Sequence, residues 1–592
     1  MRELPIEDSG KTNGPSVALL VPCVWAVAAA SLLALCRDRV LRLTPLDSDD
    51  YMRILQVRDW LAGQSWWDVS QHRMNPPGGG LLHWSRIPDL PIAGIEILLR
   101  PLAPGAAERI AAATVPLLLL LALMAVVAMV VRRLFDGTAP ALAALLLVLA
   151  SLGALVQFTP GRVDHHGWQI LMAATGLLGL LDPRPRRSGM VAGAAFAVGL
   201  AISLEGAIVA AAAAAMLLLR WIVEPAERGR AVAFLTCWAG TQALLFAATT
   251  RPLRWESVWC DAIGPQHLAA LAAAAGGTAL LTRFGAGRGP AARVALLVPP
   301  ALLAAGLYLG LAPQCRAGPF AHLDPLAYRL WYLNVDEGMP IWRQPVAAIP
   351  GLVWFSLVGV LGAARGWHAA RDAEVKRRWL VVLALALASF AAALLVRRAI
   401  GSAQILAIPG GLGVILALRA RALRLERPAT RLLALAAAFL VPSPLGGIYM
   451  GAALAPSAAD EQAAADPACD RRCELAPLAT LPPGYVLAGL DLGPPLLAFT
   501  PHQVLAGPYH RNDRAIAETM RAFLLPDRVA RATMERHAMR YLLVDPQSGE
   551  ARLYMREGPR GLMAALAAGR TPAWLVAVPL PPGNRLRLYR RR

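Results

Sequence analysis

The feature that most constrains this chain is a series of apolar runs, each roughly as long as the 20-residue helix that crosses a bilayer. Runs such as Val115–Val131 and Trp379–Val396 carry no charged residue. A helix satisfies its own backbone hydrogen bonds in hydrocarbon, so the sequence predicts an all-α polytopic membrane protein. Thirteen spans are predicted, at 16–36, 108–131, 139–158, 168–182, 189–204, 206–223, 231–249, 267–282, 293–312, 346–364, 379–396, 405–419 and 431–452.

The basic residues predict which way the spans point. The chain has a net charge of +19, but its arginines cluster in short connections between apolar runs. Such clusters are retained in the cytoplasm, so the charge indicates orientation and contact with anionic lipid, with no nucleic acid as partner. Arg37, Arg39 and Arg42 oppose this assignment, but the later clusters outnumber them. The predicted cytoplasmic clusters are Arg132-Arg133, 184–187, 228–230, 283–293, 371–378 and 419–427.

Four long segments fall on the opposite, outer side in this assignment. Three are loops, at 37–107, 250–266 and 313–345, within a membrane domain that covers 1–452. The fourth is 453–592, which loses the long apolar runs and gains prolines and short mixed strands. We expect it to be a small periplasmic α/β domain. The predicted location is the inner membrane, with the C-terminus in the periplasm.

The seven cysteines do not have the spacing of a zinc site. Cys23, Cys36 and Cys237 lie in apolar runs, where we expect them to be small buried residues. Cys469 and Cys473 lie in the polar segment that is predicted to be outside the cytoplasm, where they could form a disulfide.

Three acidic clusters lie at the ends of apolar runs on the predicted outer side. Ionisable groups are costly to hold beside hydrocarbon, so a set of them on one face is first interpreted as a site. We expect such a set to hold a divalent cation against a phosphorylated, lipid-borne substrate. The clusters are Asp-Ser-Asp-Asp-Tyr at 47–51, Gly-Arg-Val-Asp-His-His at 161–166 and Asn-Val-Asp-Glu at 334–337.

In the first cluster, Asp49 and Asp50 stand just before a predicted helix in the loop 37–107. A carboxylate there can ligate a cation and interact with the helix N-terminus. The alternative is that both residues only cap the helix, since Asp is a favoured N-cap residue. The sequence leaves both interpretations open.

The other two clusters differ in their chemistry. Asp164, His165 and His166 share a short turn between two spans, and a carboxylate with imidazoles suits a divalent transition ion. Mn²⁺ accepts such mixed oxygen and nitrogen ligands better than Mg²⁺. Glu337 precedes Gly338-Met339-Pro340, a pattern typical of a fixed turn or hinge.

These residues resemble the motifs of the GT-C superfamily of membrane glycosyltransferases. The chain looks most like the catalytic subunit of oligosaccharyltransferase, including the bacterial single-subunit and archaeal types. Asp49-Asp50-Tyr51 matches the acid-x-aromatic motif of the first outer loop. Asp164-His165-His166 matches the Asp-x-Asp motif, with histidine in place of the second acid. Glu337 matches the glutamate of a later loop, and thirteen spans followed by an outer domain are also the family pattern.

The resemblance implies roles for these side chains. Asp49, Asp164, His166 and Glu337 would hold a catalytic Mn²⁺ or Mg²⁺, which neutralises charge on the leaving lipid phosphate. Asp49, or else Asp50, would accept the proton of an acceptor hydroxyl. Glu337 would contact both the metal and the acceptor.

Arg397 and Arg398 lie at the outer end of a span, near the place where the family has an arginine that contacts the lipid pyrophosphate. A guanidinium matches the oxygens of a phosphate, so both residues are predicted to bind it. The alternative is an ordinary pair of interfacial arginines that contact lipid headgroups.

The family's Trp-Trp-Asp-Tyr-Gly motif, which recognises the asparagine sequon, is absent from the C-terminal segment. Its nearest counterpart is Leu490–Pro494, followed by the polar stretches 500–502 and 508–512. Because discrimination depends on the groups that bind a substrate hydroxyl, we predict a sugar or lipid hydroxyl as the acceptor. The predicted acceptor-binding residues are Asp491, His502, Tyr509, His510 and Arg511.

The predicted function is transfer of a sugar or oligosaccharide from a polyprenyl-(pyro)phosphate donor to a glycan, lipid or protein acceptor on the outer face of the inner membrane. Oligosaccharyltransferase-type N-glycosylation of protein is one alternative. A transporter or a non-catalytic polysaccharide-export subunit is another. Transporters carry charged or broken helices near the bilayer midplane, whereas here nearly all ionisable residues lie at the ends of spans. Glu205 is the nearest exception.

Overall fold

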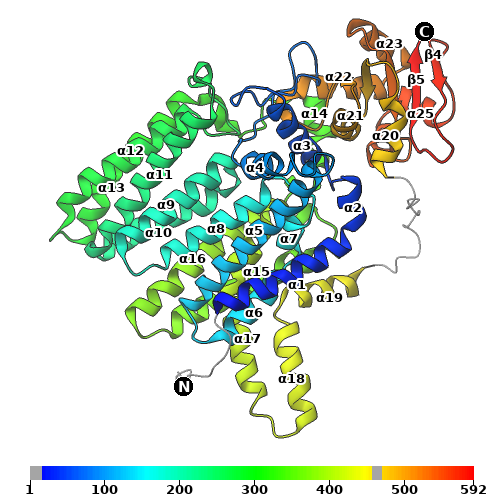
Figure 1. The fold of residues 1–592 in the computed structure, drawn as a ribbon. Helices are drawn as coiled ribbons and strands as arrows, with labels where there is room; N and C mark the ends of the chain where they lie inside the picture. Colours follow the sequence, from blue (N-terminus) through cyan, green and yellow to red (C-terminus); the bar gives the residue numbers. More distant parts are fainter. Residues whose placement is uncertain (1–16, 456–469) are drawn as a thin grey trace.

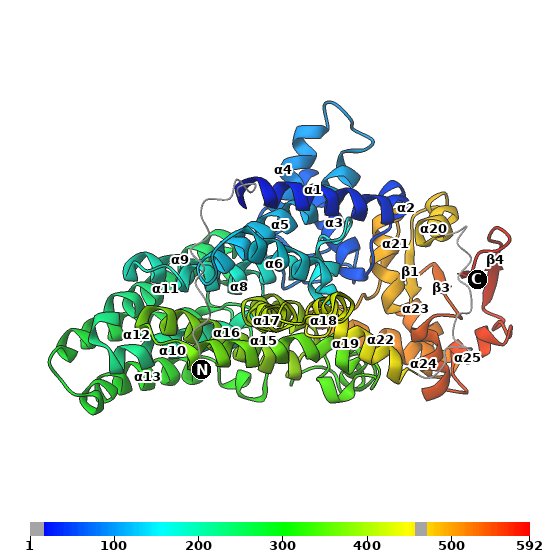
Figure 2. The same ribbon diagram turned by 90° about the horizontal axis from the view of Figure 1, so that it is seen from below.

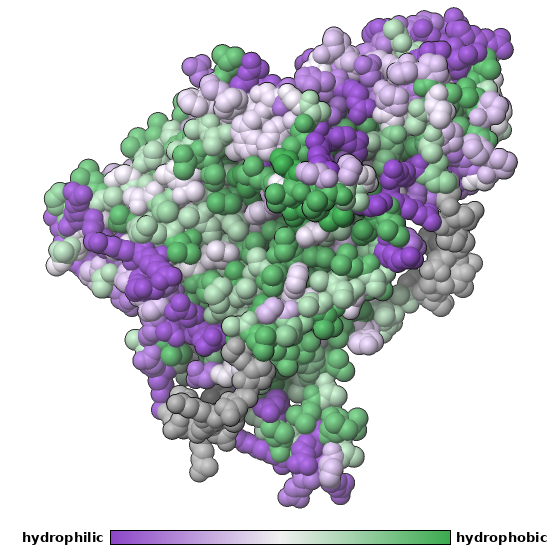
Figure 3. Space-filling model, viewed as in Figure 1, coloured by the Kyte–Doolittle hydropathy of each residue, from purple (hydrophilic) through white to green (hydrophobic). Residues whose placement is uncertain are grey.

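The computed structural model describes residues 17–455 and 470–592 as a mostly helical protein with a small mixed sheet near its C-terminus. Figures 1 and 2 show the long helices bundled together, with the C-terminal elements at one end of the bundle. Figure 3 shows a hydrophobic surface over the helical body, with hydrophilic residues gathered over the C-terminal part and at the opposite edge. These features are those of a multi-pass membrane protein.

Each of the thirteen predicted spans corresponds to helix in the structure. These helices are α1 (Val17–Leu35), α5 (Ala107–Arg132), α6 (Thr138–Ala150), α7 (Leu152–Leu155), α8 (His166–Leu180), α9 (Pro185–Ile202), α10 (Ala207–Val223), α11 (Arg228–Thr249), α12 (Pro265–Leu281), α13 (Pro290–Leu311), α15 (Ile349–Ala369), α16 (Ala373–Leu395), α17 (Ile400–Ala422), α18 (Pro428–Leu440) and α19 (Pro444–Leu454).

Fewer than thirteen of them are long and apolar enough to cross a membrane. Within 17–455 and 470–592 there are nine such helices, or up to eleven if each of two bent pairs forms one span. The two remaining predicted spans are α8, which has only 15 residues, and α9, which begins with Pro185-Arg186-Arg187. The prediction of about thirteen spans therefore overstates the number that meet this criterion.

Two predicted spans are bent. The segments Thr138–Ala150 and Leu152–Phe158 meet at 68°, and α18 and α19 meet at 88°. Pro444 begins α19, and a proline disfavours helical conformation at the residue before it, which favours a break between α18 and α19. At the first break, the hydroxyl of Ser151 donates to the carbonyl of Leu147 at 2.7 Å, a contact that often bends helices.

Small residues allow the central spans to pack closely. Of the candidate spans, the one that contains α17 is the most buried, and α13 is the least. Where α15 and α17 cross, a Cβ added to Gly410 would lie 1.9 Å from the carbonyl oxygen of Gly359. Without a hydrophobic force between helices in lipid, such close backbone contact is a main source of attraction.

The C-terminal part contains a five-stranded sheet in the order β2-β1-β3-β5-β4. The first strand pairs in parallel with its two neighbours, while the other two pairings are antiparallel. The predicted mixed α/β character is therefore confirmed. The elements are α20 (Arg471–Ala479), β1 (Tyr485–Ala488), α21 (Gly493–Phe499), β2 (Gln503–Val504), α22 (Asp513–Leu524), α23 (Asp527–Arg536), β3 (Tyr541–Val544), α24 (Gly549–Glu557), α25 (Leu562–Ala567), β4 (Leu575–Val578) and β5 (Arg587–Arg591).

The long loops pack against residues 470–592, which contain the sheet and its helices and are called the sheet domain below. Their helices are α2 (Arg37–Arg42), α3 (Ser48–Leu61), α4 (Asp89–Leu99) and α14 (Pro325–Leu330). Met52 and Leu55 of α3 belong to one hydrophobic core of the sheet domain, and Leu330 of α14 belongs to another. Arg73 donates to the carbonyl of Leu497 at 2.6 Å, which fastens the loop 37–107 to α21. The loops and the sheet domain thus share cores.

A disulfide joins Cys260 to Cys315 and so links the loop 250–266 to the loop 313–345. Nothing in the spacing of the cysteines predicts this pair. Cys36 is buried as expected, but Cys23 is exposed because its side of α1 faces away from the bundle, and Cys237 is half-buried. Cys469 lies outside the described residues, so its pairing with Cys473 stays a prediction.

Candidate active site

The first acidic cluster lies at the N-terminus of α3. Asp47 is the N-cap, and its carboxylate accepts the backbone N–H groups of Asp49 at 2.9 Å and Asp50 at 3.3 Å. Asp49 and Asp50 occupy the first turn, where the helix dipole favours negative charge. Because Asp47 already caps the helix, capping does not account for the other two acids.

The carboxylate of Asp50 is fully buried and holds the second cluster in place. It accepts the backbone N–H groups of Val163 at 2.9 Å and Asp164 at 3.0 Å. It also pairs with Arg162 at 2.9 Å, and Arg162 pairs in turn with Asp47. The oxygens of Asp50 are thus engaged within the protein, so its geometry suits a positioning role better than proton transfer.

Asp164, His165 and His166 are buried, and their ligand atoms lie within 4.8 Å of one another. Nδ1 of His165 contacts Oδ1 of Asp164, and Nε2 of His166 lies 3.3 Å from Oδ2. That Oδ2 and that Nε2 are both buried without a hydrogen-bond partner in the described part of the chain. A cation bound to both atoms would supply the partner that hydrogen bonds do not provide.

The carboxylate of Asp164 is in the form that binds a cation. Burial by itself would raise the pKa of Asp164. The neighbouring imidazoles of His165 and His166 and the guanidinium of Arg162 instead hold this pKa well below its usual value. The residue is therefore ionised at neutral pH.

Asp49 faces a cavity of about 1080 Å³ that separates the spans from the sheet domain. The cavity is large enough for a sugar together with part of an acceptor. Burial raises the pKa of Asp49 well above its usual value, and the nearby carboxylates of Asp164, Asp47 and Glu337 raise it further. Carboxylates that share a site repel one another until one binds a proton or a cation lies between them.

A chain of charged side chains connects the second cluster to the third. Nδ1 of His166 lies 3.6 Å from Glu205, and Glu205 pairs with Arg398 at 2.9 Å. Arg398 in turn lies 3.9 Å from Glu337, a longer contact, and both residues line the cavity. The structure therefore places Glu337 on the cavity wall beside Arg398, outside the compact group of Asp164 and the two histidines.

The two adjacent arginines point to different places. Arg398 lines the cavity, and its Nε is buried without a hydrogen-bond partner in the described residues. Arg397 instead donates to the side chain of Gln344 at 3.2 Å, and its backbone N–H donates to the carbonyl of Met339. Arg397 thus fastens the loop 313–345 and does not line this cavity.

The predicted acceptor-binding residues separate into two groups. Asp491, Tyr509 and His510 line the cavity. His502 is buried, where its Nδ1 accepts the N–H of Gly484 at 3.1 Å and its Nε2 donates to the carbonyl of Leu478 at 2.9 Å. Arg511 lies behind the cavity wall, paired with an acidic side chain at 2.9 Å. The geometry of His502 and Arg511 therefore suits structural roles.

Four residues at or near the cavity have no role in the sequence-based prediction. Glu205 links His166 to Arg398, and its position as the ionisable residue nearest to the middle of the spans is the signal that could have indicated it. Arg162 and His165 both belong to the second motif, but its pattern does not show which of its members face a cation. Glu550 lines the cavity wall beside Asp491, and no motif marks it.

Comparison with known proteins supports the fold and leaves the activity open. No family model matches the chain, and no curated protein matches it. Solved structures of archaeal oligosaccharyltransferase do match. The structure of AglB from Archaeoglobus fulgidus with an inhibitory peptide and a dolichol-phosphate has a TM-score of 0.65 at 16% identity, over 93% of this chain and 72% of that one.

Two further structures show the same likeness to different degrees. The Archaeoglobus fulgidus enzyme with Zn and sulfate matches with a TM-score of 0.58 at 16% identity, over 92% of this chain and 70% of that one. ArnT from Cupriavidus metallidurans bound to undecaprenyl phosphate matches with a TM-score of 0.45 at 11% identity, over 97% and 98%. The likeness to the archaeal oligosaccharyltransferase structures therefore extends to the fold, at low sequence identity.

Proposed function

We propose that the chain is a glycosyltransferase that moves a sugar or oligosaccharide from a polyprenyl-(pyro)phosphate donor to an acceptor hydroxyl on the outer face of the inner membrane. The observation that carries the proposal is the convergence of Asp49, His165 and Arg398 on one cavity, with Asp164 and His166 directly behind His165. The fold that the chain shares with archaeal oligosaccharyltransferase supports the same class of reaction.

Arg398 is suited to bind the phosphate of the donor. The residue lines the cavity at the N-terminal end of α17, and a guanidinium matches the oxygens of a phosphate. Apolar side chains including Ile170 and Val209 line a small pocket of about 40 Å³ that also contacts Arg398, so apolar side chains of the spans lie next to the proposed phosphate-binding residue.

Asp164 and His166 fit a divalent cation because Oδ2 of Asp164 and Nε2 of His166 are buried 3.3 Å apart and neither makes a hydrogen bond in the described residues. Asp49 and Glu337 would complete the ligand set from the cavity side. Bound Mn²⁺ or Mg²⁺ would supply the positive charge that stabilises a leaving phosphate. Asp50 and Arg162 hold this turn in position, as their hydrogen bonds show.

Asp49 would accept the proton of the acceptor hydroxyl. Its carboxylate faces the cavity from the first turn of α3, where a bound acceptor hydroxyl would lie. On the other side of the cavity the sheet domain offers Asp491, Tyr509 and Glu550, side chains that can bind sugar hydroxyls. Trp574 is the one tryptophan after residue 470. Its Nε1 donates a hydrogen bond to Asp527 at 2.9 Å, and it does not line the cavity. The side of the cavity formed by the sheet domain therefore favours a hydroxyl acceptor over a sequon asparagine.

The disulfide between Cys260 and Cys315 supports the outer location of the cavity. Disulfides persist in oxidising compartments such as the periplasm and are rare in the cytoplasm. Both cysteines lie in loops assigned to the outer side from the arginine clusters, and Cys260 lines the cavity. The arginine clusters and the disulfide thus both favour an outer location of the cavity.

The proposal is tested by measuring sugar transfer by the purified protein, with and without excess EDTA. The donors are polyprenyl-linked sugars, and the acceptors are molecules with free hydroxyls and an Asn-x-Ser/Thr peptide. We expect transfer to a hydroxyl acceptor that depends on Mn²⁺ or Mg²⁺ and is nearly lost in Asp164→Ala. Full activity in EDTA would contradict the metal role. Transfer to the sequon peptide that Glu337→Ala abolishes would contradict the acceptor assignment and favour N-glycosylation.

A further inference from the structure

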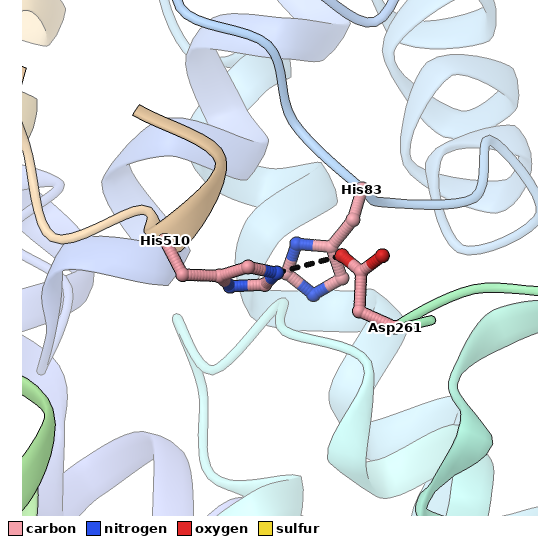
Figure 4. A group of neighbouring side chains, drawn as sticks. All are labelled: His83, Asp261 and His510. Carbon is pink, nitrogen blue, oxygen red and sulfur yellow. Dashed lines mark hydrogen bonds and ion pairs between the residues drawn. The ribbon is translucent and has the colours of Figure 1, made fainter. Parts of the chain in front are cut away.

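His83, Asp261 and His510 form a second group of side chains that can hold a metal, separate from the Asp164 cluster. His83 belongs to the loop 37–107, Asp261 follows the disulfide partner Cys260, and His510 begins the short helix η12 (His510–Asn512) of the sheet domain. One ligand atom from each lies within 4.8 Å of the others. Figure 4 shows that the two imidazoles and the carboxylate, contributed by three separate segments, meet at one point.

The contacts around this group resemble those of a metal site. Nε2 of His510 lies 2.6 Å from Oδ2 of Asp261, and the rings of His83 and His510 are 4.6 Å apart. Arg511 donates to both oxygens of Asp261, at 2.9 and 3.0 Å, and so fixes the carboxylate as an outer partner fixes a metal ligand. Among the described residues, His83 makes ring contacts with Trp84 and His510 but no side-chain hydrogen bond.

We propose that His83, Asp261 and His510 bind a second divalent transition-metal ion, for which Zn²⁺ is the best-suited natural ion and Co²⁺ a spectroscopic substitute. Two imidazoles and one carboxylate are the ligand set of a zinc site with one open position. All three residues line the cavity, so the open position faces it and takes a water or a substrate oxygen.

The proposed ion would also connect parts of the chain. Its ligands come from two loops and from the sheet domain, so binding cross-links all three segments around the cavity. An ion that binds only the folded state stabilises that state by mass action. The competing account is an ion pair of Asp261 with His510 and Arg511, in which His83 only packs against the pair.

The test uses the purified full-length chain in detergent with the substitution Asp164→Ala, which removes a ligand of the first cluster. Co²⁺ is added while its visible absorption and the unfolding temperature are recorded. We expect one tightly bound equivalent and a rise in the unfolding temperature. Both effects should be lost in His83→Gln and in His510→Gln. His72→Gln changes an exposed histidine of the same loop, whose side chain is 61% exposed, and should keep both effects.

Two results would overturn the proposal. One is unchanged Co²⁺ binding in His83→Gln and His510→Gln, and the other is no binding in the Asp164→Ala chain. Since His83 makes no side-chain hydrogen bond in the described structure, His83→Gln should fold, and far-ultraviolet circular dichroism checks this. The readouts are binding and stability, so failure here is distinct from failure of the proposed transfer reaction.

Discussion

At the scale of single residues, adjacent side chains in the motifs have different surroundings. Successive residues on a helix point about 100° apart, since 3.6 residues make one turn. Asp49 therefore faces the cavity while Asp50 is buried against Arg162. The sequence marks the motif but does not show which acid reacts, because that depends on the element packed against each face.

Replacing these two acids should separate activity from stability. Asp49→Asn removes the proposed base and should lower the rate of transfer about 10²–10⁴-fold while leaving the unfolding temperature near that of the wild type. Asp50→Asn removes one buried carboxylate partner of Arg162, which keeps Asp47, and should lower the free energy of unfolding by about 1–3 kcal/mol. Transfer assays and thermal unfolding of both variants provide the check. A fully active Asp49→Asn chain would contradict the assignment.

The arginine pair offers a matched comparison. Lysine cannot reproduce the fork that a guanidinium presents to a phosphate, so Arg398→Lys should raise the KM for the donor about 10-fold or more. Arg397 contacts Gln344 and does not line the cavity, so Arg397→Lys should change the KM little. Donor titrations on both variants test this difference. An equal effect of the two substitutions would show that Arg398 has no special contact with phosphate.

Glu550 should make stability depend on pH. Burial, with Asp491 nearby, raises the pKa of Glu550 to about 7, above its value in the unfolded chain. Between these two pKa values the folded state binds more protons, so this residue's contribution to the free energy of unfolding falls as the pH rises towards about 7. Relative to Glu550→Gln, the wild type should therefore lose stability between about pH 5 and pH 8. If the unfolding temperatures of the wild type and of Glu550→Gln change with pH in parallel, Glu550 does not cause the pH dependence.

At the scale of elements, the apolar runs are sufficient to locate the helices, and all thirteen predicted spans are helical. The apolar runs do not show where the helices bend. Pro444 lies inside an apolar run, but its missing N–H, which hydropathy does not measure, interrupts the helix. They also do not show which glycines permit close contact between helices. Gly410 and Gly276 both lie within predicted spans, but only Gly410 lies against the backbone of another helix.

Replacing these two glycines by alanine should affect stability differently, with only Gly410→Ala destabilising the protein. The Cβ of Gly410→Ala would lie 1.9 Å from the carbonyl oxygen of Gly359, so α15 and α17 must move apart at a cost of about 1–3 kcal/mol. Gly276 has no atom within 4 Å of an added Cβ, so Gly276→Ala should be neutral or should stabilise α12 by up to about 1 kcal/mol. Thermal unfolding in detergent measures both changes. Equal stability of the two variants would disprove close packing at Gly410.

At the scale of the whole molecule, the cavity is formed by segments that lie far apart in the sequence. Asp49, Arg398 and Asp491 come from a loop, a span and the sheet domain. The sequence predicts the sheet domain and the loops separately, but not the cores that they share, because contacts between distant segments leave no periodic pattern. For the same reason it does not reveal Glu205, Glu550 and Cys260 as neighbours of one cavity, or Cys315 as the disulfide partner of Cys260.

The central claim is that this cavity transfers a sugar to an acceptor of the cell envelope. The most direct measurement is mass spectrometry of envelope glycans, glycolipids and glycoproteins from cells with the active gene, without it, and with the Asp49→Ala version. We predict that at least one glycosylated species is present with the active gene and missing from both other cell lines. Identical profiles in all three, or a profile fully restored by Asp49→Ala, would contradict the claim and favour a non-catalytic membrane subunit.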